Sequence, residues 1–245
     1  MFGLANKQKQ AASAAGTLRT LSALLSYPDA AWRGYLSQMG EVLHRERVLS
    51  PLRLAELDAL IAALGGADQL EVEADYVGLF DRGRATSLHL FEHVHGDSRD
   101  RGPAMIDLAQ TYEKAGLYLA DGELPDYLPA VLEFVSTQPP REAQAFLLEM
   151  AHIINAIFSA LQQHGSPYAS VLGALLELAG EKAQAVKLAA EPPLDESWAE
   201  PVVFDGCSTQ GQARPGQAQP IRIVRPTRPT PPPAPQPGSP SGVAT

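Results

Sequence analysis

Apolar residues recur every three or four positions in one segment after another of roughly the first 195 residues of the chain. The clearest example runs from Arg141 to Gln163. Its apolar positions are Phe146, Leu147, Met150, Ile153, Ile154, Ile157, Phe158 and Leu161. This spacing places one apolar stripe along an α-helix, facing a core. A pair of β-strands would show an alternating run of apolar residues, or an Asn-Gly or Asp-Gly turn between β-branched segments, and the sequence has neither. The pattern therefore predicts an all-α fold.

Start and stop signals divide the same region into about eight helices. Ser50 and Pro51 pair an N-cap residue with a proline at the first helical position, and Gly65 and Gly66 mark the end of that helix. The other expected helices run from Thr17, as N-cap, to Tyr27, from Asp29 through Leu43, from Asp68 to Phe80, from Pro103 to Leu119, from Tyr127 to Val135 and from Pro167 through Leu178. Short connections between helices favour a compact bundle.

The composition changes near residue 200. Residues 201–245 hold 11 of the 21 prolines, four arginines and one acid, Asp205, so this stretch carries a net charge of +3. Such a composition cannot bury enough apolar surface to offset its ordering entropy, and we expect it to be disordered. The sequence thus predicts a flexible N-terminus over 1–16, a helical domain over 17–198 and a disordered tail over 199–245.

Charge and cysteine content exclude several classes of function. The whole chain carries −9, so the first 200 residues carry −12, which suits a basic partner and disfavours nucleic acid. The only cysteine, Cys207, cannot form an intrachain disulfide, which is typical of a reducing compartment. The longest uncharged apolar segment, Met150 to Leu161, is much shorter than the roughly 20 residues that span a bilayer. We therefore expect a cytoplasmic protein with no stable membrane insertion.

One segment breaks the helical pattern. It runs from Asp81 to Gly102 and is the most polar, histidine-dense and glycine-interrupted part of the helical region. Four arginines, Arg82, Arg84, Arg99 and Arg101, alternate there with the aspartates Asp81, Asp97 and Asp100. Charged loops of this kind are where contacts with a partner tend to lie. The pattern favours a binding surface, although some of these side chains would equally suit a helix cap or a polar corner of the core.

The same segment contains a possible metal motif. His89, Glu92 and His93 match H-x-x-E-H, the spacing of inverted zinc proteases, with His95 and Asp97 as further ligands nearby. A catalytic zinc needs a third protein ligand and partners that orient the imidazoles, and the sequence identifies neither. Phosphate-binding loops and a nucleophile elbow are also missing from the sequence. We therefore predict no catalytic residue, no metal and no cofactor, and keep a zinc hydrolase as an alternative.

Four stretches resemble a known family, the NarJ-type assembly chaperones of respiratory nitrate reductase, often called its delta subunit. They are Thr17 to Pro28, Tyr76 to Arg84, Ser87 to Gly102 and Glu123 to Pro129, and the whole resemblance covers about Leu18 to Trp198. The related TorD- and DmsD-like chaperones of other molybdenum enzymes are similar in pattern but lack the run Phe-Glu-His-Val-His-Gly. The length and proline content of the tail depart from the family pattern.

The resemblance implies an all-helical cytosolic chaperone that is not an enzyme. Members bind the apo catalytic (alpha) subunit of nitrate reductase and hold it while the molybdenum cofactor and an iron-sulfur cluster are inserted, before membrane attachment. Binding is directed in part at the N-terminal peptide of that subunit, which resembles a twin-arginine signal, and molybdenum cofactor delivery proteins are further candidate partners. An acidic body attracts a basic peptide, and a helical bundle can offer an apolar groove to an amphipathic helix.

Resemblance and residue pattern together give a set of candidate client-binding residues. They are Tyr76, Phe80, Asp81, Arg82, His89, Glu92, His93, His95, Asp97, Arg99 and Arg101. Two alternatives to the chaperone remain open: the zinc hydrolase, and a helical scaffold that recruits partners through its tail.

Overall fold

The computed structural model describes residues 14–96, 98–120 and 122–186 of the 245. The chain divides into two units, 1–191 and 192–245, and every described residue belongs to the first. Within the described ranges the regular structure is α-helical apart from one π-helix, and a single antiparallel bridge joins His89 to Tyr127. The all-α prediction is confirmed. The predicted tail, 199–245, lies outside the described residues.

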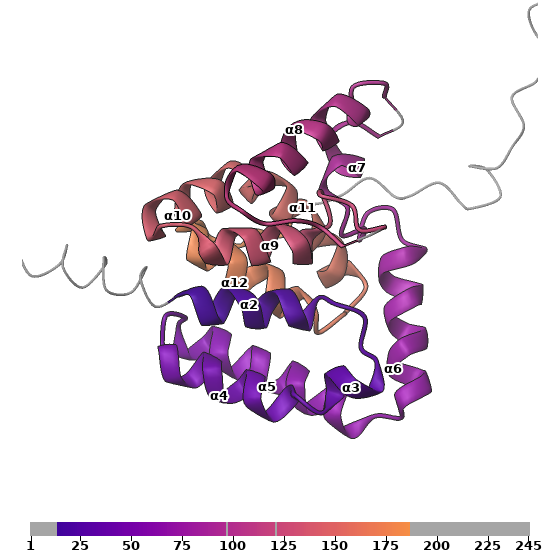
Figure 1. Ribbon diagram of the computed structural model, residues 1–245. Coiled ribbons are helices and arrows are strands. Elements are labelled where there is room, and N and C mark those ends of the chain that lie inside the picture. Colours follow the sequence, from indigo (N-terminus) through magenta and orange to yellow (C-terminus); the bar gives the residue numbers. More distant parts are fainter. Residues whose placement is uncertain (1–13, 97, 121, 187–245) are drawn as a thin grey trace, which may run out of the picture. The chain divides into compact units, whose positions relative to one another are not determined.

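Eleven α-helices and the π-helix η1 follow one another along the described chain (Figure 1). They are α2 (Ala14–Leu24), α3 (Ala30–Arg33), α4 (Leu36–Glu46), α5 (Pro51–Gly66), α6 (Gln69–Tyr76), η1 (Val77–Asp81), α7 (Leu90–Val94), α8 (Arg101–Lys114), α9 (Leu128–Thr137), α10 (Pro140–Glu149), α11 (Ala151–Gln163) and α12 (Ala169–Ala179).

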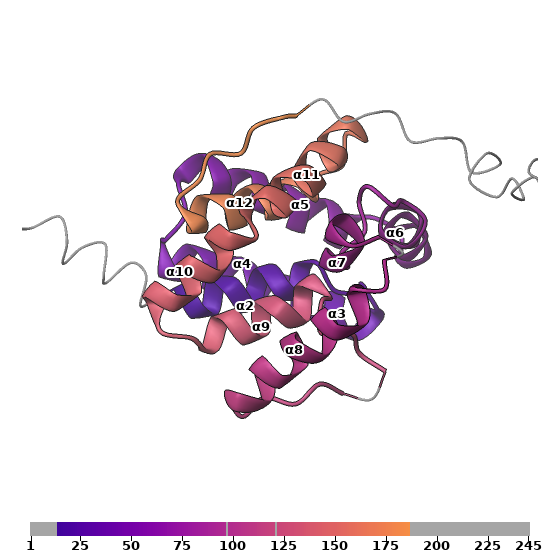
Figure 2. The ribbon, with the colours of Figure 1, turned by 90° about the horizontal axis from the view of Figure 1, so that it is seen from above.

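The core lies where α2, α9 and α12 meet their neighbours. Figure 1 shows α2 between the α4 and α5 pair on one side and α9 on the other. Fully buried side chains of this core include Leu21, Leu24, Leu57, Leu60, Leu128, Leu132, Ile154 and Ile157. Helix α8 lies at the periphery in both ribbon views, and Tyr112 is its one buried residue (Figure 2).

Two predicted helices differ from the structure, the first in its start and the second in its continuity. Thr17 is not an N-cap, because α2 is already helical at Ala14 and the Thr17 side chain is fully buried, with its backbone N–H and its hydroxyl both donating to Glu46 at 2.7 Å. The helix predicted from Asp29 is two helices, α3 and α4, separated at Gly34. In contrast, α5 begins after an N-cap at Ser50 and ends at Gly66, as predicted.

The helix predicted from Arg141 to Gln163 is also two helices. The chain breaks at Met150, and α10 and α11 are bent by 61° to each other. The bend lets α10 pack on α9 and α12 while α11 packs on α12 and α7. No single helix of the described residues is both long and apolar enough to cross a membrane, and only this bent pair reaches that length and composition together.

Candidate functional site

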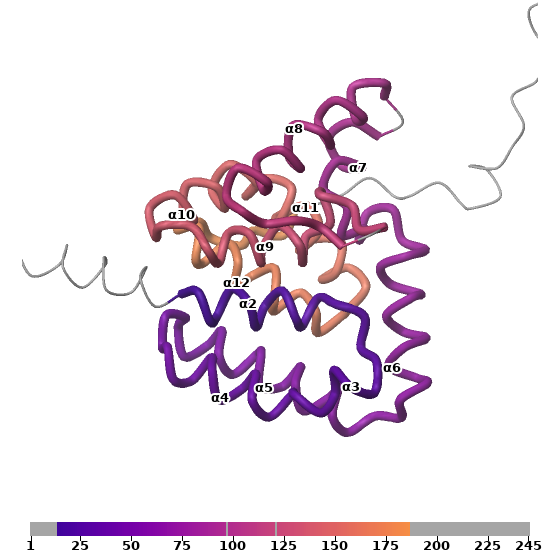
Figure 3. Tube along the Cα trace, viewed as in Figure 1, coloured from indigo at the N-terminus to yellow at the C-terminus, as the bar shows by residue number. Residues whose placement is uncertain are grey.

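The first candidate residues, Tyr76 and Phe80, lie where α6 passes into η1, the stretch that follows α6 in the trace of Figure 3. A π-helix inserts an extra residue per turn and is often found at functional sites. Here it carries Phe80 into contact with other aromatic rings. Phe80 lies 4.8 Å from the Tyr76 ring and 5.1 Å from the Tyr168 ring, measured between centroids.

Tyr76 joins this segment to the core. Its buried hydroxyl donates to the Leu25 carbonyl at 2.7 Å and lies 3.0 Å from the Tyr127 hydroxyl. Burial raises the pKa of Tyr76, and the neighbouring Tyr127 raises it further. Tyr76 is therefore a neutral donor, and the aromatic cluster is a fixed wall beside the polar segment.

A turn after η1 sends the chain back toward α7. Thr86 makes this turn, because its hydroxyl donates to the carbonyls of Leu79 and Gly83. A Cβ at Gly83 would lie 2.2 Å from the Thr86 hydroxyl oxygen and 2.7 Å from the Leu79 carbonyl oxygen. Only glycine fits this position, which accounts for a glycine between two arginines.

Asp126 ties the His89 segment to the start of α9. Its side chain is fully buried; it accepts the Phe91 N–H at 3.1 Å and contacts His89 Nδ1 at 3.3 Å. Its backbone carbonyl accepts the Leu90 N–H at 3.0 Å, and the Leu128 N–H donates to the Leu88 carbonyl at 2.8 Å. Two of the stretches that carry the family resemblance, Ser87 to Gly102 and Glu123 to Pro129, are therefore adjacent in space.

The charges around this junction form a small network. Nη2 of Arg101 lies 3.5 Å from a Glu92 oxygen and 3.8 Å from an Asp126 oxygen. The hydrogen bond to Asp126 raises the pKa of His89, and the charges of Asp126 and Glu92 raise it further. Burial and the Arg101 charge oppose this rise. The surface thus holds partly exposed cations above one buried carboxylate.

Two adjoining pockets open on this surface. The polar pocket, of about 420 Å³, is lined by Phe80, Asp81, Arg82, Gly83, Arg84, Ser87, His89, Glu92, Gly96 and Arg101. The aromatic pocket, of about 410 Å³, is lined by Tyr27, Tyr76, Phe80, Asp81, Leu88, His89, Gly122, Glu123, Leu124 and Tyr127. Because Phe80, Asp81 and His89 line both pockets, one binding partner could contact the two together.

The structure brings most of the predicted residues together. Phe80, Asp81, Arg82, His89, Glu92 and Arg101 line the polar pocket, and Tyr76 lines the aromatic pocket. His93 instead turns back, with Nε2 at 2.9 Å from the Ser87 carbonyl, and the His95 ring packs edge-on against Phe91. Arg99 is exposed and lines neither pocket. Asp97 lies outside the described residues.

The zinc alternative lacks the required geometry. In an H-x-x-E-H site both imidazoles face one metal, whereas here His89 pairs with Asp126 and His93 with a backbone carbonyl. No group of three His, Cys, Asp or Glu side chains within the described ranges is arranged to hold a metal ion.

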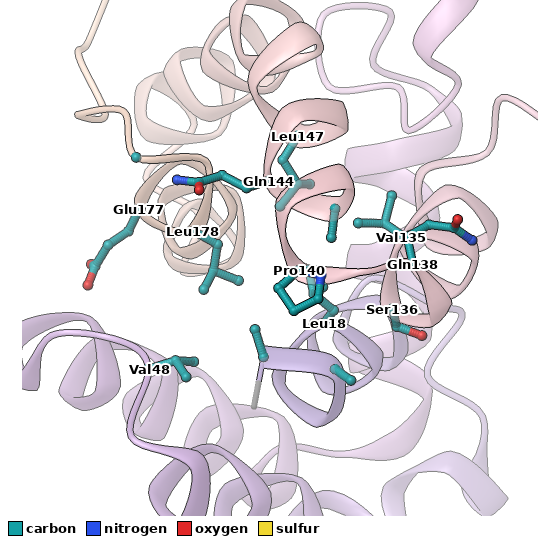
Figure 4. Close-up of a pocket in the computed structure, with 14 residues that line it drawn as sticks. Leu18, Val48, Val135, Ser136, Gln138, Pro140, Gln144, Leu147, Glu177 and Leu178 are labelled. Carbon is teal, nitrogen blue, oxygen red and sulfur yellow. The ribbon is translucent and has the colours of Figure 1, made fainter. Parts of the chain in front are cut away.

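Sequence reasoning expected that the bundle could offer an apolar groove but did not identify the residues that line the groove found here. It has a volume of about 440 Å³ and is lined by Ala14, Ala15, Leu18, Val48, Val135, Ser136, Gln138, Pro140, Ala143, Gln144, Leu147, Glu177, Leu178 and Gly180. Figure 4 shows side chains from α2, α9, α10 and α12 around one opening. Glu177 is the one charged residue in this lining, and its carboxylate accepts from the N–H and the hydroxyl of Ser50.

A helical scaffold with two pockets of mixed polarity and an apolar groove is typical of a protein that binds other polypeptides. Comparison with known proteins identifies the family within this class. The family described as "Nitrate reductase delta subunit" matches residues 49–173, which is 125 of the 245 residues. The nitrate reductase molybdenum cofactor assembly chaperone NarJ of Escherichia coli (strain K12) is 44% identical over 169 residues, covering 69% of this chain and 72% of NarJ.

Two further relatives agree with this match. The probable nitrate reductase molybdenum cofactor assembly chaperone NarW of Escherichia coli (strain K12) is 50% identical over 114 residues, 46% of this chain and 49% of NarW. The chlorate reductase assembly chaperone protein of Ideonella dechloratans is 33% identical over 129 residues, 51% of this chain and 55% of that protein. The chain belongs to the nitrate reductase delta subunit family, and it is an assembly chaperone rather than an enzyme.

Proposed function

We propose that this chaperone binds the apo catalytic subunit of a respiratory nitrate reductase in the cytoplasm and holds it for molybdenum cofactor insertion before membrane attachment. The observation that carries the proposal is the 44% identity with a relative named for nitrate reductase molybdenum cofactor assembly. The polar pocket supports it, because all of its lining residues fall within the matched range 49–173. A relative named for chlorate reductase makes that enzyme the competing client.

The client surface comprises the polar and aromatic pockets. Arg82 and Arg84 are exposed at the polar pocket, and Tyr27 and Leu124 are exposed apolar residues at the aromatic pocket. Contacts with a large partner combine apolar anchors with a polar rim that fixes orientation. This pair of pockets offers both within one surface.

The N-terminal signal-like peptide of the client binds the apolar groove. An amphipathic helix in such a groove buries its apolar face and leaves its basic residues at the rim. The groove is suitable because aliphatic side chains line it beside the polar side chains of Ser136, Gln138 and Gln144. Its single charged residue is Glu177, and the first 200 residues carry −12. Proteins that deliver the molybdenum cofactor would then approach the client while the chaperone still covers these two regions.

The proposal is tested by affinity purification of the tagged chain from cells of its own organism grown anaerobically with nitrate. We expect the nitrate reductase catalytic subunit to co-purify, and a chain of residues 1–198 to retain it. Recovery of chlorate reductase alone would show that chlorate reductase, and not nitrate reductase, is the client. Loss of all client on removing 199–245 would favour the scaffold alternative, since that scaffold acts through its tail.

Deletion of the gene gives the second test. Nitrate reductase activity should vanish while its catalytic subunit remains detectable by antibody, because the chaperone acts after synthesis of the client. Normal nitrate reduction in the deletion strain, with no paralogue expressed, would overturn the proposal.

A further inference from the structure

Asp126 is the most deeply buried charged residue at the junction, and it has no exposed surface. A buried carboxylate is costly unless its oxygens are paired. One oxygen pairs with His89, and the other accepts the Phe91 N–H and faces Arg101. These three partners lie 25 to 37 positions away in the sequence, and all lie in or beside the polar pocket. One buried group thus determines the positions of several surface groups.

The contact with Asp126 also determines what His89 offers to a partner. A ring nitrogen that faces a carboxylate carries the proton, so Nδ1 of His89 is the donor. Nε2 has no hydrogen-bond partner among the described residues, and the side chain is 33% exposed. In the neutral ring Nε2 is an acceptor, and in the protonated ring it is a second donor.

From this geometry, and resting on the proposed function, we propose that Asp126 is a positioning residue of the client surface. Its carboxylate holds His89, the start of α7 and Arg101 in one arrangement, and Nε2 of His89 donates to an acceptor oxygen of the client. Asp126 itself has no exposed surface and does not touch the client. Its effect on binding therefore passes through His89 and Arg101.

The groups that face His89 come from four parts of the chain. They are Asp126 and Tyr127 before α9, Glu92 on α7, Arg101 at the start of α8, and Asp81, Arg82 and Arg84 across the polar pocket. The hydrogen bond to Asp126 is the largest cause of the raised His89 pKa. His89 is accordingly a donor at Nε2 below its raised pKa and loses this donor as the pH rises through that value.

The test uses the full chain with Asp126→Asn, which keeps the shape and one acceptor oxygen but removes the charge. The control is Asp107→Asn, the same change at an exposed position on α8. NMR titration gives the His89 pKa, and calorimetry with the purified apo nitrate reductase catalytic subunit gives the affinity from pH 6 to 9. We expect Asp126→Asn to lower the His89 pKa and to weaken binding at pH 7 by about tenfold, or about 1.4 kcal/mol, while the control changes neither.

A double-mutant cycle separates positioning from general stability. If Asp126 acts through His89, adding Asp126→Asn to His89→Gln should weaken binding much less than it does in the wild-type chain. Full additivity, or an unchanged His89 pKa in Asp126→Asn, would overturn the proposal. If Asp126→Asn does not fold, the wild-type chain still tests the proposal. An affinity for the client that does not change with pH as His89 titrates would also overturn it. Absence of any wild-type binding would instead reject the proposed function.

Discussion

Glu92 and His93 are neighbours in sequence, but the structure predicts that replacing each by alanine affects stability and function in different proportions. The Glu92 carboxylate is 32% exposed, and among the residues that the structure describes its one hydrogen bond is to Arg101 at 3.5 Å. Exposed ion pairs contribute about 0.2–1 kcal/mol to the free energy of unfolding. Because 1 kcal/mol shifts Tm by about 2–4 °C in a chain of this size, Glu92→Ala should lower Tm by at most about 4 °C.

His93 has a structural contact instead. Its Nε2 bonds to the Ser87 carbonyl at 2.9 Å and closes the segment that carries His89. Removing one partner of a partly buried hydrogen bond costs about 1–3 kcal/mol. His93→Ala should therefore lower Tm by about 2–12 °C on the same conversion, and its loss of function should follow its loss of stability.

The assay measures both quantities for each variant. Thermal unfolding of the purified chains gives Tm, and nitrate reductase activity in a deletion strain, divided by the amount of catalytic subunit, gives activation. We expect Glu92→Ala to reduce activation far more than its Tm change explains, and His93→Ala to reduce both in proportion. Wild-type activation by Glu92→Ala, or an activation loss that only tracks Tm, would refute the assignment of Glu92 to the client surface.

Three other predictions concern packing, backbone and charge. Gly83→Ala should destabilise the chain by about 1–3 kcal/mol in urea unfolding, because the new Cβ would lie 2.7 Å from the Leu79 carbonyl oxygen, a backbone atom, whereas Gly66→Ala meets nothing within 4 Å and should be neutral or stabilising. Arg47 has φ 53° at the end of α4, so Arg47→Gly should raise the free energy of unfolding by up to about 1 kcal/mol; a decrease would contradict this account. The on-rate of a basic signal-like peptide should fall between 0.1 M and 1 M salt, as the Debye length shrinks from about 10 Å to about 3 Å. A constant on-rate in stopped-flow measurements would show that charge plays no part in recognising the peptide.

The sequence predicts helices well where their ends carry local signals. Ser50 directly precedes α5, and Pro51 and the two glycines lie at its ends, so α5 has the predicted bounds. The break at Met150 carries no proline or glycine, and the apolar stripe continues through it. The bend goes with the packing, since α10 packs on α9 as well as α12, whereas α11 packs on α7 as well as α12. The prediction at Thr17 fails for a related reason. Its side chain bonds to Glu46, which is 29 positions away in the sequence, so the residues around Thr17 cannot reveal this contact.

The same limit applies to the candidate site. The polar segment is visible because its composition differs from that of its neighbours, and the structure does gather Phe80, His89 and Arg101 at one pocket. Asp126 is not visible in this way, since a single aspartate before a helix reads as an ordinary cap. The apolar groove gives no local signal at all, because its lining comes from the two ends of the described chain and from α9 and α10.

Helix α12 has a consequence for the way the chain is made. Nine of its eleven residues are buried, it packs on α2, α5, α10 and α11, and it is the last helix of the described chain. The central element of the core is therefore synthesised after every helix that packs on it. While the ribosome is still translating the first 168 residues, the apolar faces of α2 and α5 lack their partner and are open to aggregation or to other chaperones. This chaperone must complete its own core before it can protect another protein.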